Sequence, residues 1–169
     1  RLKVSGAFHS SLMEEARAFS ELKKQGWKPK RTLVYCAWDG EEQGLLGSTE
    51  WAEAHADELK QKAAVYLNSD SNGRGFLGVS ASHTLENFVN TFAKDIEDPE
   101  TKLSVWKRWQ ARAIANASLP DKNQIRSRSD LRVGALGSGS DYTAFLDHLG
   151  IASVNIGFGG EDDGGIYHS

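Results

Sequence analysis

Leu33-Val34-Tyr35-Cys36-Ala37 runs directly into Trp38-Asp39-Gly40-Glu41-Glu42-Gln43-Gly44, so two adjacent carboxylates follow an apolar run. The apolar run predicts a buried strand over residues 31–38. Neighbouring side chains of an extended loop point in opposite directions, so Glu41 and Glu42 can perform different tasks at one site. One carboxylate can hold a cation while the other moves a proton, as in hydrolytic zinc sites. An acidic, solvated turn that opens a helix is the alternative interpretation.

The composition is that of an ordinary globular chain. Its 169 residues are enough for one α/β domain, with 39% hydrophobic residues, 25% charged residues and a formal net charge of −3. The chain lacks the basic excess typical of nucleic-acid binding, and its apolar runs are too short to cross a membrane. The single cysteine, Cys36, excludes an internal disulfide. We expect a piece of a longer polypeptide, because the chain begins at Arg1 and stops just after a loop.

Hydrophobic periodicity predicts alternating strands and helices. Helices are expected over residues 8–25, 45–60, 83–96, 103–117 and 142–149, and strands over residues 31–38, 63–69, 76–80 and 152–158. The polar, charged residues 119–132 predict an exposed loop or flap. This alternation is typical of a three-layer α/β domain with an at least partly parallel sheet.

In such a sheet the polar site lies beyond the carboxyl ends of the strands. Glu41, Glu42, Asp70 and His168 each follow a predicted strand. Three carboxylates and one imidazole that meet at one edge are a plausible zinc shell. Asp70 could instead serve a local Asx turn, and His168 could be a solvated histidine.

A glycine-rich turn, Gly137-Ser138-Gly139-Ser140-Asp141, precedes the helix expected over residues 142–149. Ser140 or Asp141 could cap that helix. A nucleophilic serine is rejected, because no strand-Gly-x-Ser-x-Gly-helix elbow is present. Surface positions are expected for the remaining histidines, His9, His55, His83 and His148.

Six motifs occur in order from near Phe19 to the last residue. They are Leu22-Lys23-Lys24-Gln25-Gly26-Trp27, residues 38–51, Asn68-Ser69-Asp70-Ser71, residues 136–141, Leu149-Gly150-Ile151-Ala152-Ser153 and Tyr167-His168-Ser169. Together they resemble the co-catalytic zinc aminopeptidases and carboxypeptidases. Within that superfamily the similarity is to the branch of glutamate carboxypeptidase II and transferrin receptor, the N-acetylated-alpha-linked acidic dipeptidase-like proteins. The resemblance implies a peptidase domain with a mixed, largely parallel three-layer α/β/α fold, present here as an incomplete part over residues 1–169.

The resemblance also implies roles for individual residues. Glu41 corresponds to the general acid/base that activates a zinc-bound water, Glu42 and His168 to ligands of one zinc, and Asp70 to a ligand of the other. The loop Ser138-Gly139-Ser140 corresponds to the lining of the substrate pocket, and Tyr167 to the tyrosine beside the tetrahedral intermediate. The implied reaction is peptide-bond hydrolysis, in which two zinc ions lower the pKa of a bridging water.

The upstream part of the family pattern is not matched. The family supplies a further histidine and a bridging aspartate from an Asp-Pro-x-Ser-Gly motif, but Leu2-Lys3 stand where Asp-Pro is expected, before Ser5-Gly6. Two of the five expected ligands are therefore absent, and we expect the chain alone to be weakly active or inactive although its parent is a peptidase. His9 is a conceivable substitute ligand. The arginines that recognise acidic substrates in glutamate carboxypeptidase II correspond here to Asn155 and Gly157, which places acidic-peptide specificity in doubt.

Other functions stay open on the same fold. A receptor-like or scaffold domain without metals is one, and a deacetylase or cyclase is another. Relatives in this branch imply a peptide substrate, a homodimeric parent whose helical dimerisation domain is absent from this chain, and an exported or membrane-anchored location.

Overall fold

The computed structural model describes residues 10–161, and their side chains from residue 15 onward. The chain divides into two compact units, Arg1–Asp39 and Gly40–Ser169.

The first unit contains α1, Ser10–Lys24. The helix ends at Lys24 and is terminated by Gly26, whose φ of 91° is the left-handed conformation that glycine adopts readily. The amide of Gly26 donates to the carbonyl of Lys23 and that of Trp27 to the carbonyl of Leu22, at 3.0 Å each. Phe19 stacks on Trp27 with ring centroids 5.5 Å apart. The helix predicted over residues 8–25 is thus confirmed within the described residues.

The strand predicted over residues 31–38 is wrong. The sheet contains only strands from the second unit, and Leu33 and Val34 are 47% and 67% exposed. A strand is stabilised by a hydrogen-bonded neighbour, which an apolar run cannot supply for itself. Tyr35 instead places its ring 6.3 Å from that of Phe19. Partial burial raises the pKa of the Cys36 thiol.

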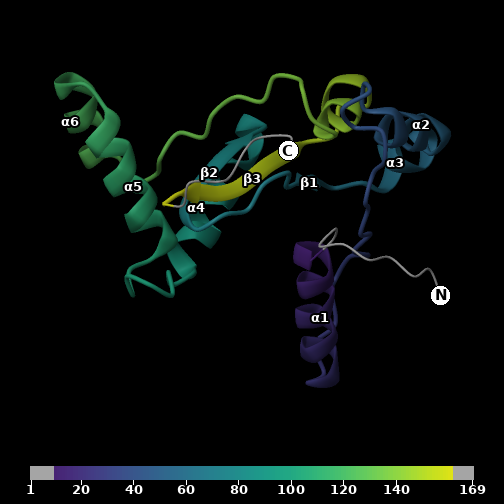
Figure 1. Ribbon diagram of the computed structural model, residues 1–169, viewed down its shortest axis with the longest axis horizontal. Helices are drawn as coiled ribbons and strands as arrows, with labels where there is room; N and C mark the ends of the chain where they lie inside the picture. Colours follow the sequence, from purple (N-terminus) through teal and green to yellow (C-terminus); the bar gives the residue numbers. More distant parts are fainter. Residues whose placement is uncertain (1–9, 162–169) are drawn as a thin grey trace. The chain divides into compact units, whose positions relative to one another are not determined.

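The second unit holds the remaining helices and the sheet (Figure 1). The single helix predicted over residues 45–60 is two helices, because the chain bends at His55, which lies between them. The helices predicted over residues 83–96, 103–117 and 142–149 are confirmed, the last as a wide π-type turn. These helical elements are α2 (Leu46–Ala54), α3 (Ala56–Lys62), the short η1 (His83–Leu85), α4 (Glu86–Asp95), α5 (Val105–Asn116), α6 (Leu119–Ser127) and η2 (Ala144–His148).

A three-stranded sheet with the order β1-β3-β2 forms the centre of this unit. Its strands are β1 (Tyr66–Asn68), β2 (Gly75–Ala81) and β3 (Ser153–Gly160). β1 runs parallel to β3, with Tyr66 opposite Ser153 and Asn68 opposite Asn155, whereas β2 runs antiparallel to β3. This small mixed sheet with its helices confirms an incomplete α/β fold.

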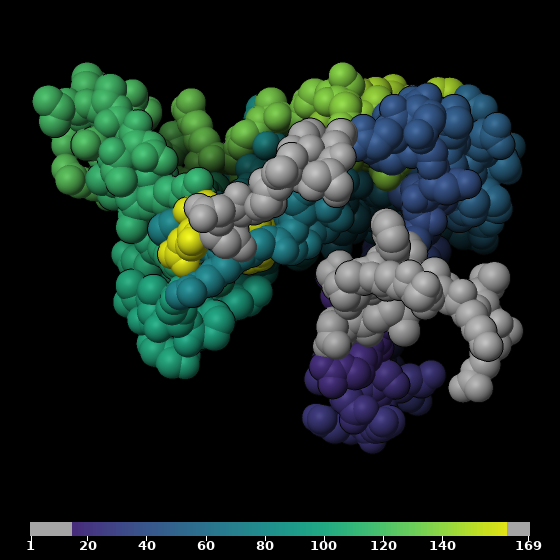
Figure 2. All heavy atoms as spheres, in the orientation of Figure 1, coloured from purple at the N-terminus to yellow at the C-terminus, as the bar shows by residue number. Residues whose placement is uncertain are grey.

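The core lies where α4 and α5 cover β2. Leu77 of β2 packs in one buried cluster with Ala93 of α4 and Trp106 of α5. Ala81, Val89 and Val154 form a second cluster beside it. The far end of β3 reaches the surface, where some of its yellow spheres are visible in Figure 2, and Phe158 is 38% exposed.

The loop predicted over residues 119–132 is wrong, because α6 occupies its first part. Ser118 precedes the helix, and its hydroxyl lies 2.5 Å from a carboxylate oxygen of Asp121 in the first turn. Pro120 lies in that first turn, where its missing amide hydrogen costs nothing. Ile125 of this helix packs against the core. The prediction of a loop failed because it was based on the polar composition of the segment and did not consider this single apolar contact.

Among the described residues, no helix is both long enough and apolar enough to cross a membrane.

Asn90 is a fully buried polar side chain that joins three segments. Its side-chain oxygen accepts from Trp106 Nε1 and from the amide of Leu131, at 2.7 Å each. Its Nδ2 donates to the carbonyl of Leu131 at 2.8 Å. This one side chain therefore satisfies polar groups of α5 and of the segment after α6.

We expect Asn90→Ala to lower the free energy of unfolding by about 3 kcal/mol, because several buried polar groups lose their partner. Urea denaturation followed by circular dichroism measures the change. Asn87→Ala, at an exposed position on the same helix, is the matched control and should stay within about 0.5 kcal/mol of the wild type. Equal losses in the two variants would contradict this assignment.

Candidate active site

The acidic segment forms a closed turn before α2. The amides of Gly44 and Leu45 donate to the carbonyl of Glu41 at 3.0 and 2.8 Å, and the amide of Leu46 donates to the carbonyl of Gly40 at 3.0 Å. The expectation of an extended loop is therefore wrong at this point. Leu45 has a φ of 59°, an unusual left-handed conformation for a branched residue, which it adopts as the turn passes into the helix. Glu41 is partly buried and Glu42 is exposed, so the two carboxylates have different surroundings.

Asp70 lies just beyond the carboxyl end of β1, as predicted, and is held by buried neutral donors. Ser140 Oγ donates to the carboxylate of Asp70, with distances of 2.8 and 2.9 Å to its two oxygens. Asn68 Nδ2 lies 3.1 Å from each of the same oxygens. It also lies 3.0 Å from Ser140 Oγ and 3.1 Å from Asn155 Oδ1. We call Asn68, Asp70, Ser140 and Asn155 the polar cluster.

Aromatic packing joins the acidic turn's helix to this cluster. The Phe145 ring of η2 stacks on Tyr66 of β1 with centroids 4.0 Å apart and an interplanar angle of 8°. The same ring lies 6.2 Å from Trp51 of α2. Since α2 also packs directly on η2, this helical turn is held between α2 and β1.

Asp141 is a buried carboxylate next to this cluster, only 8% exposed. Its Oδ1 has no hydrogen-bond partner in the described part of the chain, and neither has Thr143 Oγ1. Burial raises the pKa of the Asp141 carboxyl, a hydrogen bond with Ser48 opposes that rise, and the charge of Asp70 adds to it. The ionised form of Asp141 is therefore disfavoured in the folded chain.

The structure brings together only some of the predicted site residues. Asp70 and Ser140 are in direct contact, whereas Ser138 and Gly139 are exposed neighbours of Ser140. Glu41, Glu42 and Asp70 do not form a group that could hold a metal ion; over residues 15–161 no three His, Cys, Asp or Glu side chains do. Tyr167, His168 and His9 lie outside the described residues.

Sequence reasoning missed Asn68 and did not link Asn155 to Asp70. Asn68 is 4% exposed, and burial of an amide at the end of a strand requires hydrogen-bond partners. The link to Asn155 comes from the parallel register, which places Asn68 directly opposite Asn155 and cannot be read from the sequence.

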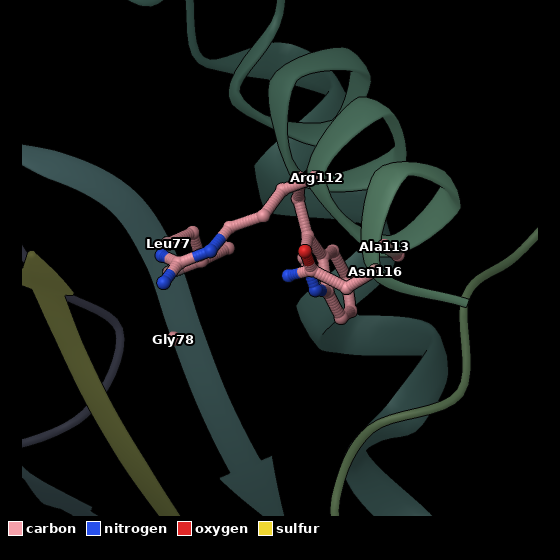
Figure 3. Close-up of a pocket in the computed structure, with 6 residues that line it drawn as sticks. Leu77, Gly78, Arg112, Ala113 and Asn116 are labelled. Carbon is pink, nitrogen blue, oxygen red and sulfur yellow. The ribbon is translucent and has the colours of Figure 1, made fainter. Parts of the chain in front are cut away.

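Two cavities lie away from the predicted site residues. One, of about 290 Å³, lies between β2 and α5 and is lined by Leu77, Trp109 and Arg112 among others (Figure 3). In it Arg112 already has partners, because one guanidinium nitrogen donates to the Gly159 carbonyl at 3.2 Å and the group lies over the Phe76 ring. None of the predicted site residues lines this cavity.

The other cavity, of about 520 Å³, contains a compensated charge network. Arg108 pairs with Asp98 at 2.7 Å and also with Glu161. The amide of Thr101 and the guanidinium of Arg108 hold the pKa of the Asp98 carboxyl well below its usual range. Because both arginines of the network, Arg74 and Arg108, are paired with carboxylates, we interpret it as structural.

Comparison with known proteins agrees with the motifs. The family model described as "Peptidase family M28" matches residues 5–169. The chain belongs to peptidase family M28. It is 38% identical over 161 residues to a probable glutamate carboxypeptidase of Arabidopsis thaliana, LAMP1, covering 94% of this chain and 21% of that protein. A probable glutamate carboxypeptidase of Arthroderma benhamiae is 40% identical over 161 residues, with 94% and 20% covered.

The aminopeptidase NAALADL1 of rat is 30% identical over 151 residues, with 87% of this chain and 19% of that protein covered. The chain thus spans about a fifth of the length of these relatives. Their names include both carboxypeptidases and an aminopeptidase, so the family membership does not fix which end of a peptide is attacked.

Family M28 peptidases are generally metal-dependent, and the described residues supply only part of a metal site. Glu42 and Asp70 offer carboxylate oxygens, which zinc accepts as ligands. The carboxylate of Asp70 accepts hydrogen bonds from Ser140 and Asn68, as metal-ligating carboxylates commonly do, but no third ligand joins it over residues 15–161. The described residues by themselves therefore do not complete a zinc site.

Asp141→Asn tests the burial of the Asp141 carboxylate. The pKa of the Asp141 carboxyl is raised in the folded state, so the free energy of unfolding of the wild type falls as pH rises through that pKa. The neutral asparagine side chain of the variant does not ionise, so the variant does not lose this stability. We expect the variant to be more stable than the wild type by about 1 kcal/mol at pH 7, with a smaller difference at pH 4.

Urea denaturation at both pH values measures the difference. Asp147→Asn, at an exposed position on η2, is the control and should show no pH-dependent gain. A variant of Asp141 that is less stable than the wild type at pH 7 would contradict the expectation.

Proposed function

We propose that this chain is part of the catalytic domain of a zinc-dependent exopeptidase of the carboxypeptidase or dipeptidase type. The family M28 match over residues 5–169 carries the proposal, because it includes the acidic pair Glu41-Glu42 and the later Asp70. The different surroundings of Glu41 and Glu42 support a division of labour between them.

In this proposal Glu41 is the general base that takes a proton from the attacking water and returns it to the leaving amine. Glu42, Asp70 and His168 would be metal ligands in a complete site, where two zinc ions would make the attacking water more acidic. The loop Ser138-Gly139-Ser140 lines the substrate pocket, and its exposed residues Ser138 and Gly139 contact the substrate. Tyr167 lies beside the reacting carbonyl. Hydrolysis then needs no covalent enzyme intermediate.

Under the same proposal we expect the 169-residue chain alone to be weakly active or inactive. The chain spans about a fifth of its relatives, and its described residues do not group three metal ligands. Ligands from the rest of a longer protein would complete the site. For that protein we propose a homodimer outside the cytosol.

The substrate is proposed to be a peptide without a required acidic side chain. At position 157, a Cβ would lie 2.6 Å from the backbone oxygen of Ser71, so this position excludes any side chain, including a basic one. Asn155 is neutral and bonds to Asn68. These two observations support weak selection for acidic peptides.

A metal-free scaffold domain is the second candidate. The lack of a three-ligand group over residues 15–161 favours it. Retention of Glu41 argues against it, because a domain without hydrolytic activity does not need the base.

Zinc content discriminates between the two functions. We would measure zinc per purified chain by elemental mass spectrometry after dialysis, both for the 169-residue chain and for the longer protein. About two zinc ions in the longer protein and none in the chain support the peptidase proposal. No zinc in either would favour the scaffold.

We expect Glu41→Gln in the longer protein to lower kcat by at least about a thousandfold, because the water loses its base, while zinc content is unchanged. Hydrolysis of a panel of neutral and acidic dipeptides measures the effect. Glu53→Gln, at an exposed position on α2, is the control and should retain full activity. Full activity of the Glu41 variant would overturn the assigned role.

A further inference from the structure

The polar cluster has a buried side and an exposed side. Asn68 and Ser140 are 4% and 5% exposed, whereas Asp70 is an exposed residue. The carboxylate of Asp70 is therefore held from within the protein by two buried groups, while the residue itself stays accessible to solvent.

The hydrogen-bonding capacity of Ser140 is largely used inside the cluster. A serine hydroxyl has one hydrogen, and that of Ser140 goes to the carboxylate of Asp70 at 2.8 and 2.9 Å. The oxygen also accepts from Asn68 Nδ2 at 3.0 Å. Ser140 thus has no hydrogen left to donate to a substrate.

The side chain of Asn68 is fixed in the same way. Its Oδ1 accepts from the Tyr66 hydroxyl at 3.2 Å, and its NH₂ group lies on the side of Asp70, because a carboxylate accepts hydrogen bonds and does not donate them. Its Nδ2 then faces Asp70, Ser140 and Asn155. Asn68 is held by the sheet, and Ser140 is held by the packing around η2. A rigid scaffold of this kind fixes the direction of a reactive group.

We propose that Ser140 and Asn68 are positioning residues that fix the direction of the Asp70 carboxylate, and that Ser140 is not a substrate contact. Substrate contact in this loop belongs to the exposed Ser138 and Gly139. This inference rests on the proposed function, because it assumes that Asp70 acts in the peptidase site.

Steady-state kinetics of the longer protein test the two roles of Ser140. We expect Ser140→Ala and Asn68→Ala to lower kcat by at least about tenfold with KM within about twofold of the wild type, because a misdirected Asp70 slows the reaction without weakening substrate binding. Ser138→Ala should instead raise KM. A several-fold rise in KM with unchanged kcat for Ser140→Ala would overturn the proposal.

Ser153→Ala is the matched control for loss of a buried serine. Ser153 is fully buried, and its hydroxyl donates to the carbonyl of Ile151 at 3.0 Å, outside the polar cluster. This variant should lower stability while kcat and KM stay unchanged. An equal loss of kcat in Ser153→Ala and Ser140→Ala would reduce the role of Ser140 to general stability and overturn the proposal.

Nuclear magnetic resonance of the ¹⁵N-labelled 169-residue chain tests the geometry without any activity. We expect the side-chain amide resonances of Asn68 to shift in Ser140→Ala and in Asp70→Ala but not in Ser153→Ala. Unchanged resonances in Ser140→Ala would overturn the proposal. If the wild-type longer protein hydrolyses no peptide, the proposed function fails, and this measurement alone decides whether the two residues hold Asp70.

Discussion

The backbone hydrogen bonds of β3 hold the second unit together, because β1 and β2 both pair with β3 and not with each other. The two strands join β3 in opposite senses, so its residues must satisfy a parallel and an antiparallel ladder at once. Asn155 is opposite Asn68 on one side and Ser80 on the other. The register of this strand therefore sets both the core over β2 and the position of the polar cluster beyond β1.

Side-chain packing on β1 also positions the segments that carry the candidate catalytic residues. Phe145 lies against both Tyr66 and Trp51, so β1, η2 and α2 are fixed by one ring. The acidic turn leads directly into α2, and the glycine-rich turn leads directly into η2. Two segments that carry predicted site residues are thus oriented by the same aromatic contacts, although about a hundred residues separate them in the sequence.

Features that depend on local periodicity could be predicted from the sequence. Features that depend on residues distant in the sequence mostly could not. The helix terminated by Gly26 follows from its spacing and its cap. The run 31–38 has the composition of a strand, but a strand is defined by its neighbour, which composition does not encode. The helix after Ser118 was missed because its residues are mostly polar, so that the core contact of Ile125 gives no periodic apolar pattern. Asp70 was identified from its place after a strand, whereas Ser140, 70 residues away, was linked to it only by the fold.

The partners of Asp70 also determine what the carboxylate can attract. A lysine or arginine beside it would cancel its charge, whereas the serine and the asparagine are electrically neutral. Their hydrogen bonds therefore fix direction and leave a full negative charge at the edge of the sheet. That charge produces a field that draws cations and positively charged groups from solvent, and salt in the medium weakens the attraction.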